Sequence, residues 1–192
     1  MTRIIVAFAL LLTLLSGCTT APYYQKSYSM PGNQWNMAYK PSFVIDIEDT
    51  NMLYNVSFII RHTNNFPYSN IWMNVLVKAP GEATFKKTRI EIPLATPQGT
   101  WLGVGMGEIY EQRRVMMLDH KDAQRVADSF DRHIMSVSEQ SINDLFSKKG
   151  RYEIRLEQNM REQSLPDILH IGLRIEKGSA KKEITPATKP LS

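Results

Sequence analysis

The sequence predicts an all-β fold, an antiparallel β-sandwich of about seven or eight strands with one amphipathic helical insertion near residues 121–146. Short stretches in which apolar and polar residues alternate recur along the chain, and turns with Gly, Pro or Asn separate them. Only one stretch has a helical period, whereas a parallel sheet would need a helix after most strands. The composition, 43% hydrophobic and 22% charged, is sufficient for the core of one domain.

The first 17 residues have the layout of a secretory signal peptide. Arg3 precedes an apolar run over 4–14, which is well short of the roughly 20 residues that span a bilayer. Residues 15–18, Leu-Ser-Gly-Cys, resemble the lipobox of bacterial lipoproteins, which implies cleavage after Gly17 and lipidation of Cys18 with fatty acids such as palmitate. The alternative is an ordinary signal peptide that contains a Cys. However, this is the only Cys in the chain, and a lone thiol is a liability in an oxidising compartment.

The sandwich domain is predicted to cover residues 42–178. Residues 18–41 are rich in Tyr, Pro, Gly, Asn and Gln and have no period, so we expect a tether on which Trp35 and Tyr39 dock against the fold. Residues 179–192 are polar and contain Pro, and they are predicted to be a disordered tail.

Each predicted strand rests on alternation. In the second strand, Tyr54, Val56, Phe58 and Ile60 are expected to point inward. The alternating stretches predict strands over 42–47, 54–61, 71–77, 84–92, 113–118, 150–158 and 168–176. The helix is predicted from about 121 to 137 with a short further turn to 146, because apolar residues recur there every three or four positions.

The Gly-rich segment 99–107 superficially resembles a phosphate-binding loop. It lacks the Lys-Ser/Thr pair of such loops and does not lead from a strand into a helix. Alternating Gly residues favour a bulged strand that another group approaches closely. Trp101, Gly103 and Gly105 share one face of this strand, and we expect Trp72 to be a candidate for covering it.

Charge and residue spacing argue against several functions. The net charge of +4 comes from scattered Lys and Arg residues, so a nucleic-acid role is not expected. The four His residues form no metal-ligand spacing, and no nucleophile motif is present. An acidic run over 46–49 fits a solvated turn better than a calcium site. We therefore predict no enzyme, no metal and no cofactor beyond the lipid on Cys18, although two acids can still meet in space as a hydrolase pair.

The candidates for interaction are Tyr68, Trp72, Trp101 and Arg161. The three aromatic residues, together with Tyr110, can stack on sugar rings, or they can pack in the core. Arg161 follows a predicted strand, and its five donors can staple the loop to an acid such as Asp46 or Asp49. The alternatives for Arg161 are contact with a partner protein and a freely solvated side chain.

Four blocks of the chain, in order behind the lipobox, resemble the gliding-motility lipoprotein GldH family. The resemblance covers about 43–177, with Phe66 standing where the family has Tyr and with a longer helix-forming stretch from 121 to 147. The blocks are Phe43 to Ile47 followed by Ile59 to Trp72, with Pro67-Tyr68 inside it; Pro93-Leu94-Ala95 leading to the segment from Gly99 to Gly107; Gly150 to Ile154 with Gln158-Asn159-Met160-Arg161; and Leu165-Pro166-Asp167-Ile168 with Ile171 to Ile175.

The resemblance implies a non-enzymatic membrane lipoprotein that supports gliding motility and the associated protein secretion machinery. Its partners are then a membrane, through the lipid, and other envelope proteins, with no nucleic acid and no small-molecule ligand. The mature start at Thr19 has no acidic run of the kind that marks surface export, so the domain is expected to face the periplasm. The alternative is a carbohydrate-binding surface lipoprotein.

Overall fold

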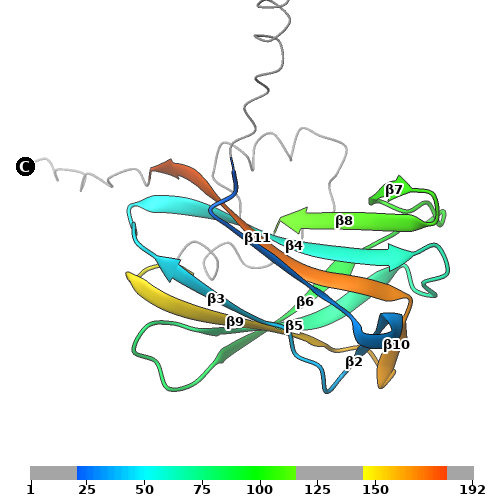
Figure 1. The fold of residues 1–192 in the computed structure, drawn as a ribbon, viewed down its shortest axis with the longest axis horizontal. Helices are drawn as coiled ribbons and strands as arrows, with labels where there is room; N and C mark the ends of the chain where they lie inside the picture. Colours follow the sequence, from blue (N-terminus) through cyan, green and yellow to red (C-terminus); the bar gives the residue numbers. More distant parts are fainter. Residues whose placement is uncertain (1–20, 116–144, 181–192) are drawn as a thin grey trace, which may run out of the picture.

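The computed structural model describes residues 21–115 and 145–180, which form three antiparallel sheets (Figure 1). The signal peptide, Cys18, residues 116–144 and the tail from 181 lie outside the described residues. The elements are β1 (Tyr24–Ser29), the 3-10 turn η1 (Pro31–Asn33), β2 (Gln34–Asn36), β3 (Ser42–Ile47), β4 (Met52–Thr63), β5 (Asn70–Lys78), β6 (Lys86–Pro93), β7 (Val104–Met106), β8 (Ile109–Val115), β9 (Gly150–Gln158), β10 (Ser164–Pro166) and β11 (Ile168–Ala180). No helix within the described ranges is both long and apolar enough to cross a membrane.

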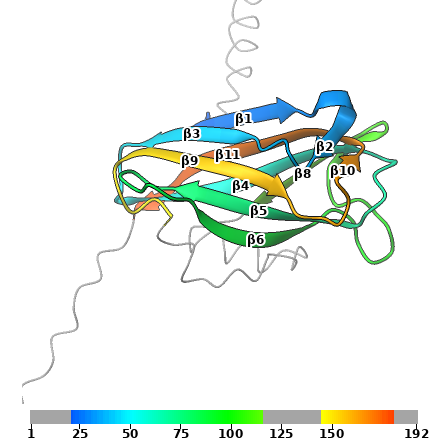
Figure 2. The same cartoon turned by 90° about the horizontal axis from the view of Figure 1, so that it is seen from below.

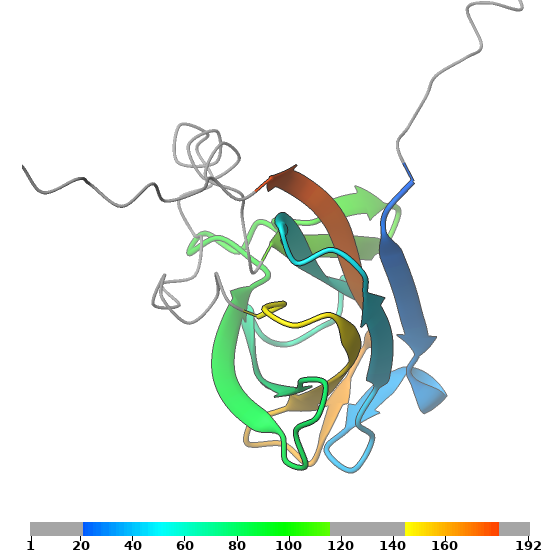
Figure 3. The same cartoon turned by 90° about the vertical axis from the view of Figure 1, so that its left-hand side faces the viewer.

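Two of the sheets pack face to face as the layers of a sandwich. One has five strands in the order β1-β11-β4-β8-β7, and the other has four in the order β3-β9-β5-β6. Figure 2 shows the two layers from below, and Figure 3, seen from the left of Figure 1, shows how they curve around a common interior. A small sheet of β2 and β10 completes the architecture.

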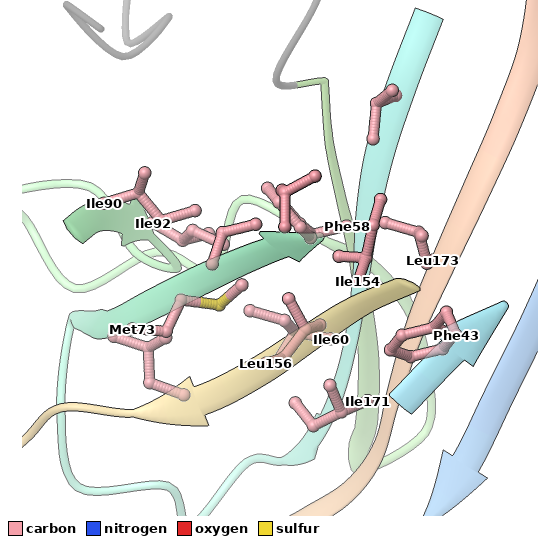
Figure 4. Packing of buried hydrophobic residues seen from close by; sticks show 14 of the residues in the cluster. Phe43, Phe58, Ile60, Met73, Ile90, Ile92, Ile154, Leu156, Ile171 and Leu173 are labelled. Carbon is pink, nitrogen blue, oxygen red and sulfur yellow. The ribbon is translucent and has the colours of Figure 1, made fainter. Parts of the chain in front are cut away.

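Alternation along the strands places the apolar side chains between the layers. In β9, Tyr152, Ile154 and Leu156 are fully buried, while the residues between them are half-buried or exposed. β4 shows the predicted inward set from Tyr54 to Ile60, and its position inside the sheet also buries Ile59 on the opposite face. Figure 4 shows side chains from both sheets meeting in this core, which burial of apolar area stabilises.

The strand register defines two ends of the sandwich. At one end, which we call the proximal end, Tyr24 at the start of β1 pairs with Ile175 of β11, and β8 and β11 terminate nearby. At the other end, a row of paired residues crosses the whole five-stranded sheet: Ser29, His170, Arg61, Glu111 and Val104. We call this second end, which includes the β7–β8 hairpin at the right of Figure 1, the distal end.

The predicted fold class is wrong in its strand number and its helix. The described residues contain eleven strands and no α-helix. Most of the predicted insertion lies outside the described residues, and its last residues, Leu145 and Phe146, lie in a turn. Phe146 is buried, with its ring 5.5 Å from Tyr54 and 5.0 Å from Tyr152, so the strands hold it as part of the core.

Part of the segment predicted as a tether belongs to the sandwich. β1 pairs with β11 over six residues, and Tyr24 and Tyr28 lie against the core. Trp35, in β2, is fully buried and donates a hydrogen bond from Nε1 to the Tyr39 carbonyl at 2.9 Å. The folded region therefore starts at or before Tyr24. Strand pairing of β1 and burial of the Trp35 indole hold these residues in the fold, although the sequence shows no sustained alternation there.

Candidate interaction surface

Five aromatic rings meet at the distal end and form a continuous cluster, which we call the end cluster. Its members are His62, Phe66, Tyr68, Trp101 and Tyr110. The His62 ring centroid lies 4.5 Å from that of Trp101, 5.6 Å from Phe66 and 5.9 Å from Tyr110. Tyr68 extends the cluster through Phe66 at 5.5 Å. These spacings are those of favourable aromatic pairs, so the rings give the distal end a rigid base.

His62 is fully buried at the centre of the end cluster. Its Nδ1 lies 2.9 Å from the Thr63 carbonyl oxygen, which can only accept a hydrogen bond, so Nδ1 carries the ring proton. Burial lowers the pKa of His62 because it disfavours the charged imidazolium, and the bond to Thr63 opposes this effect. Its Nε2 has no hydrogen-bond partner among the described residues. His62 therefore acts as a neutral aromatic ring at neutral pH.

Hydrogen bonds tie separate loops to the end cluster. The Trp101 Nε1 donates to Oδ1 of Asn64 at 2.8 Å, and the Asn64 backbone N–H donates to the Glu108 carbonyl at 2.7 Å. Thr63 donates from Oγ1 to the Asp167 carboxylate at 2.7 Å and from its backbone N–H to the Asp167 carbonyl at 3.0 Å. Asp167 has a positive φ of 59°, which turns the chain between β10 and β11 and aims both acceptors at Thr63.

Tyr110, and not Trp72, covers the Gly-rich strand. A Cβ atom on Gly105 would lie 2.7 Å from Cε1 of Tyr110, and one on Gly103 would lie 2.8 Å from the Glu111 carbonyl oxygen. The close approach predicted from the alternating Gly residues is therefore present, but the covering groups come from the adjacent strand β8. Sequence spacing alone did not reveal that the two strands form a hairpin.

The β7–β8 hairpin exposes an apolar patch beside the end cluster. Val104 is 84% exposed, Met106 87% and Ile109 41%. Met106 pairs with Ile109 across the hairpin, and Val104 lies two residues from Met106, so all three side chains point to the outer face. We call these three residues the hairpin patch. Large apolar side chains with this exposure mark a surface that another molecule can cover.

Trp72 lies apart from the end cluster. It is on the outer face of the four-stranded sheet, where the Arg89 guanidinium stacks 4.2 Å from its ring centroid. Trp101 lies at the distal end against His62 of the other sheet. The sugar-binding interpretation needs at least two aromatic residues exposed on one concave face. Trp72 lies on a strand of the four-stranded sheet, whereas Trp101 lies outside the strands and packs at the distal end, so the two Trp residues do not form such a face together. Of the aromatic candidates, Tyr68, Trp101 and Tyr110 are brought together in the end cluster, and Trp72 is not.

The loop after β9 is held by Gln158. Its side-chain amide donates to the Glu162 carbonyl at 2.8 Å and to the Gln163 carbonyl at 3.4 Å, and its Oε1 accepts from the Met160 N–H at 2.9 Å. A hydrogen bond with Glu162 raises the pKa of Tyr68 and ties the same loop to the end cluster. Gln158 continues the inward series of β9, and a polar residue at an inward position is the sequence signal for this role.

Arg161 is exposed and makes no staple to the predicted acids. Asp46 is bonded instead by Arg151, with Nε 3.1 Å from Oδ1, and the Asp49 carboxylate accepts from the Asn51 backbone N–H at 2.9 Å. The acidic run therefore forms a turn and a surface ion pair. Within the described ranges, the side chain of Arg161 has no ion pair, which leaves partner contact or solvation as its role.

Outside the distal end, two glutamates of β9, Glu153 and Glu157, each form two ion pairs. Glu153 lies 3.2 Å from Lys78 and 2.7 Å from Arg155. Burial raises the pKa of Glu153, but the hydrogen bonds from Arg155, Ser42 and Lys78 lower this pKa by more, so it is lowered overall. Glu157 lies 2.6 Å from Lys40 and 3.5 Å from Lys87. In the part of the chain that the structure describes, no three His, Cys, Asp or Glu side chains are grouped so as to hold a metal ion.

Comparison with known proteins identifies relatives along most of the chain. A protein named "Gliding motility lipoprotein GldH homolog" from Christiangramia forsetii is 26% identical over 177 residues, which cover 88% of this chain and 93% of that protein. "Gliding motility lipoprotein GldH" from Flavobacterium johnsoniae is 25% identical over 170 residues, which cover 85% and 89%. A solved structure, CBM35 from Cellvibrio japonicus Abf62, matches 76% of this chain and 75% of its own at 14% identity, with a TM-score of 0.27.

The family model described as GldH lipoprotein matches residues 22–126, more than half of the chain. The matched range runs from β1 through the end-cluster residues and the hairpin patch. The chain belongs to the GldH lipoprotein family.

Proposed function

We propose that this protein is a non-enzymatic lipoprotein of the cell envelope that supports gliding motility and the associated protein secretion through contacts of its distal end with another protein. The names of the two relatives support the motility role. The link to secretion comes from the resemblance of the four sequence blocks.

One observation carries the proposal: each of the four blocks that resemble the family, far apart in sequence, contributes residues that lie together at or beside the distal end. Asn64 of the first block bonds Trp101 of the second, and Thr63 bonds Asp167 of the last. The Asn159 backbone N–H, from the third block, donates a hydrogen bond to the Trp72 carbonyl of the first block at 2.8 Å. These contacts support one composite surface, made of the end cluster and the hairpin patch, as the functional part of the domain.

The proposed membrane attachment is through lipid on Cys18. Each buried methylene contributes about 0.8 kcal/mol, so two or three acyl chains give a lasting anchor. The domain then faces the periplasm with its proximal end, where β1 begins at Tyr24, next to the membrane. The proposed partners are envelope proteins, and the function requires no nucleic acid, small-molecule ligand or cofactor.

Deletion of the gene in a host that both glides and secretes adhesins tests the proposal. Loss of colony spreading and of cargo export, with recovery by the wild-type chain, is the expected result. Complementation with the Lys86→Ala variant serves as control, because this exposed residue lies away from the distal end. Normal spreading and normal export in the deletion strain would overturn the proposed function.

A further inference from the structure

The two large sheets end in four edge strands, and three of these carry charged side chains at exposed positions. β6 presents Lys86, Lys87 and Arg89, β1 presents Lys26, and β3 presents Asp46. Charges on an edge strand discourage the addition of a further strand, because pairing would bring them against the incoming chain and remove them from water.

The fourth edge, β7, has no such protection. Its three residues are Val104, Gly105 and Met106, which carry no charge, and all three are exposed. The strand pairs with β8 on one side only. Among the described residues, no backbone hydrogen bond outside the sheet ladders involves β7. An uncharged, exposed edge with apolar side chains is the type of edge to which another strand adds.

The hairpin geometry sets which backbone groups point to the open side. Two residues, Gly107 and Glu108, connect the strands, so the closing pair Met106 and Ile109 exchanges both hydrogen bonds. The next pair, Gly105 with Tyr110, is then the non-hydrogen-bonded kind. The N–H and C=O of Gly105 therefore point away from β8, into the position that an added strand would occupy.

We propose that β7 is a docking edge for an extended segment of a partner protein, which adds as a sixth strand to the five-stranded sheet. The segment bonds the free backbone groups of Gly105. Its side chains alternate, so those on the outer face pack on Val104 and Met106 and are apolar. Those on the inner face pass over Gly105, which has no side chain of its own, and reach the Tyr110 ring. This inference deepens the proposed function, on which its biological setting rests.

Two other occupants fit the surface less well. A second copy paired through its own β7 contributes only three residues to the contact. The area that three residues bury is far less than the roughly 800 Å² per partner of a standard interface, and two rigid domains cannot wrap around each other to bury more area. A flexible segment can continue from β7 along the end cluster. A membrane would meet Glu108 at the hairpin tip and Glu111 beside Val104, which anionic headgroups disfavour.

Photo-cross-linking in the deletion host tests the inference with the full chain. p-Benzoylphenylalanine is placed at position 104 or at position 106, and at Thr88 on the edge strand β6 as the exposed control. Mass spectrometry then maps the cross-linked residues. We expect positions 104 and 106 to reach one protein, at residues two apart in its sequence, with no such product from position 88. This two-residue spacing is the signature of a paired strand.

A charged edge provides the second arm. The Val104→Lys/Met106→Lys variant should lose the cross-linked product and colony spreading while its melting temperature stays unchanged, because both side chains are exposed. Val44→Lys/Thr88→Lys puts the same charges on the other sheet and should keep spreading. Cross-links to lipid, to a second copy, or to residues three or four apart would overturn strand addition, as would normal spreading of the charged variant. If the deletion strain itself spreads and exports normally, the proposed function fails instead.

Discussion

At the residue scale, Gln158 has a buried side-chain amide that forms all of its hydrogen bonds with the backbone of one short loop. It is 2% exposed and makes three hydrogen bonds to backbone groups of residues 160–163. Gln158→Leu keeps the approximate volume but leaves two carbonyls and one N–H without their partner, so we expect a loss of about 1–3 kcal/mol of unfolding free energy. Urea unfolding of the domain measures this.

Arg161→Leu is the matched control for Gln158, since it changes a neighbouring side chain that is exposed and unpaired within the described ranges. We expect the control to change the unfolding free energy by less than about 0.5 kcal/mol. Equal losses in the two variants would mean that the Gln158 bonds do not stabilise the loop.

Gly105 has a structural reason to lack a side chain. The Tyr110 ring lies where its Cβ would be, and this ring is itself packed 5.9 Å from both His62 and Trp101. Gly105→Val should therefore displace the ring and destabilise the fold by about 1–3 kcal/mol through overpacking. Thermal unfolding checks this, with Met106→Leu as a control at an exposed neighbour. A melting temperature equal to that of the wild type would show that the ring yields without cost.

The buried His62 predicts a pH dependence. Its pKa in the folded protein is lowered by burial, so the unfolded chain binds the proton more readily in the window below about pH 6.5. The stability that neutral His62 contributes is complete above about pH 6.5 and is lost as pH falls toward the lowered folded value, at a slope of at most about 1.4 kcal/mol per pH unit. NMR titration should find the His62 ring still neutral at pH 6.5. A ring half-protonated there would contradict the prediction.

At the scale of elements, alternation predicted the strands that form the core and missed those that close the sheets. β3, β5 and β9 occupy nearly the predicted ranges, because one buried face gives a clear two-residue period. β1 is an edge strand whose inward series is Tyr24, Lys26 and Tyr28, with an exposed Lys in the middle that hides the period. β2 and β10, with three residues each, are too short to show one.

The candidate site was predictable only in part for the same reason. Tyr68, Trp101 and Tyr110 could be selected as aromatic candidates, but the contacts that join Tyr68 to Trp101 pass through His62 and Phe66, whose proximity depends on the turn after β4. Val104 and Met106 of the hairpin patch lie in the alternating Gly-rich segment, but that alternation does not reveal that the segment forms a hairpin with the strand that begins at Ile109. Long-range contacts of this kind require the sheet order, which one sequence does not supply.

The N-terminal strands give the element-scale prediction. A chain that starts at Ser42 lacks β1 and Trp35, and so exposes part of the inner face of β11 and a cavity beside β10. We expect it to fail to fold or to melt far below a chain that starts at Ala21, since loss of a buried Trp alone costs about 3–5 kcal/mol. Circular dichroism during heating compares the two chains, and equal melting temperatures would restore the tether interpretation for residues up to 41.

At the scale of the whole molecule, the proposed anchor and the distal surface belong to opposite ends. The chain between Cys18 and Tyr24 spans at most about 20 Å when extended, so lipid on Cys18 would hold the proximal end near the bilayer. With that attachment, the strand register would direct the end cluster and the hairpin patch away from the membrane. This arrangement makes membrane attachment and partner contact separable properties.

Cys18→Ala tests that separation. The thioether has no other Cys on which to form, so the variant should leave the membrane fraction, whereas its fold should be unchanged because the sandwich begins only near Tyr24. Fractionation of cells measures the first property and the melting temperature of the released chain measures the second. One result would refute the lipid anchor: a Cys18→Ala chain that also carries Val104→Lys/Met106→Lys stays in the membrane fraction after high-salt washing. Neither the thioether nor the proposed partner could then hold the chain there.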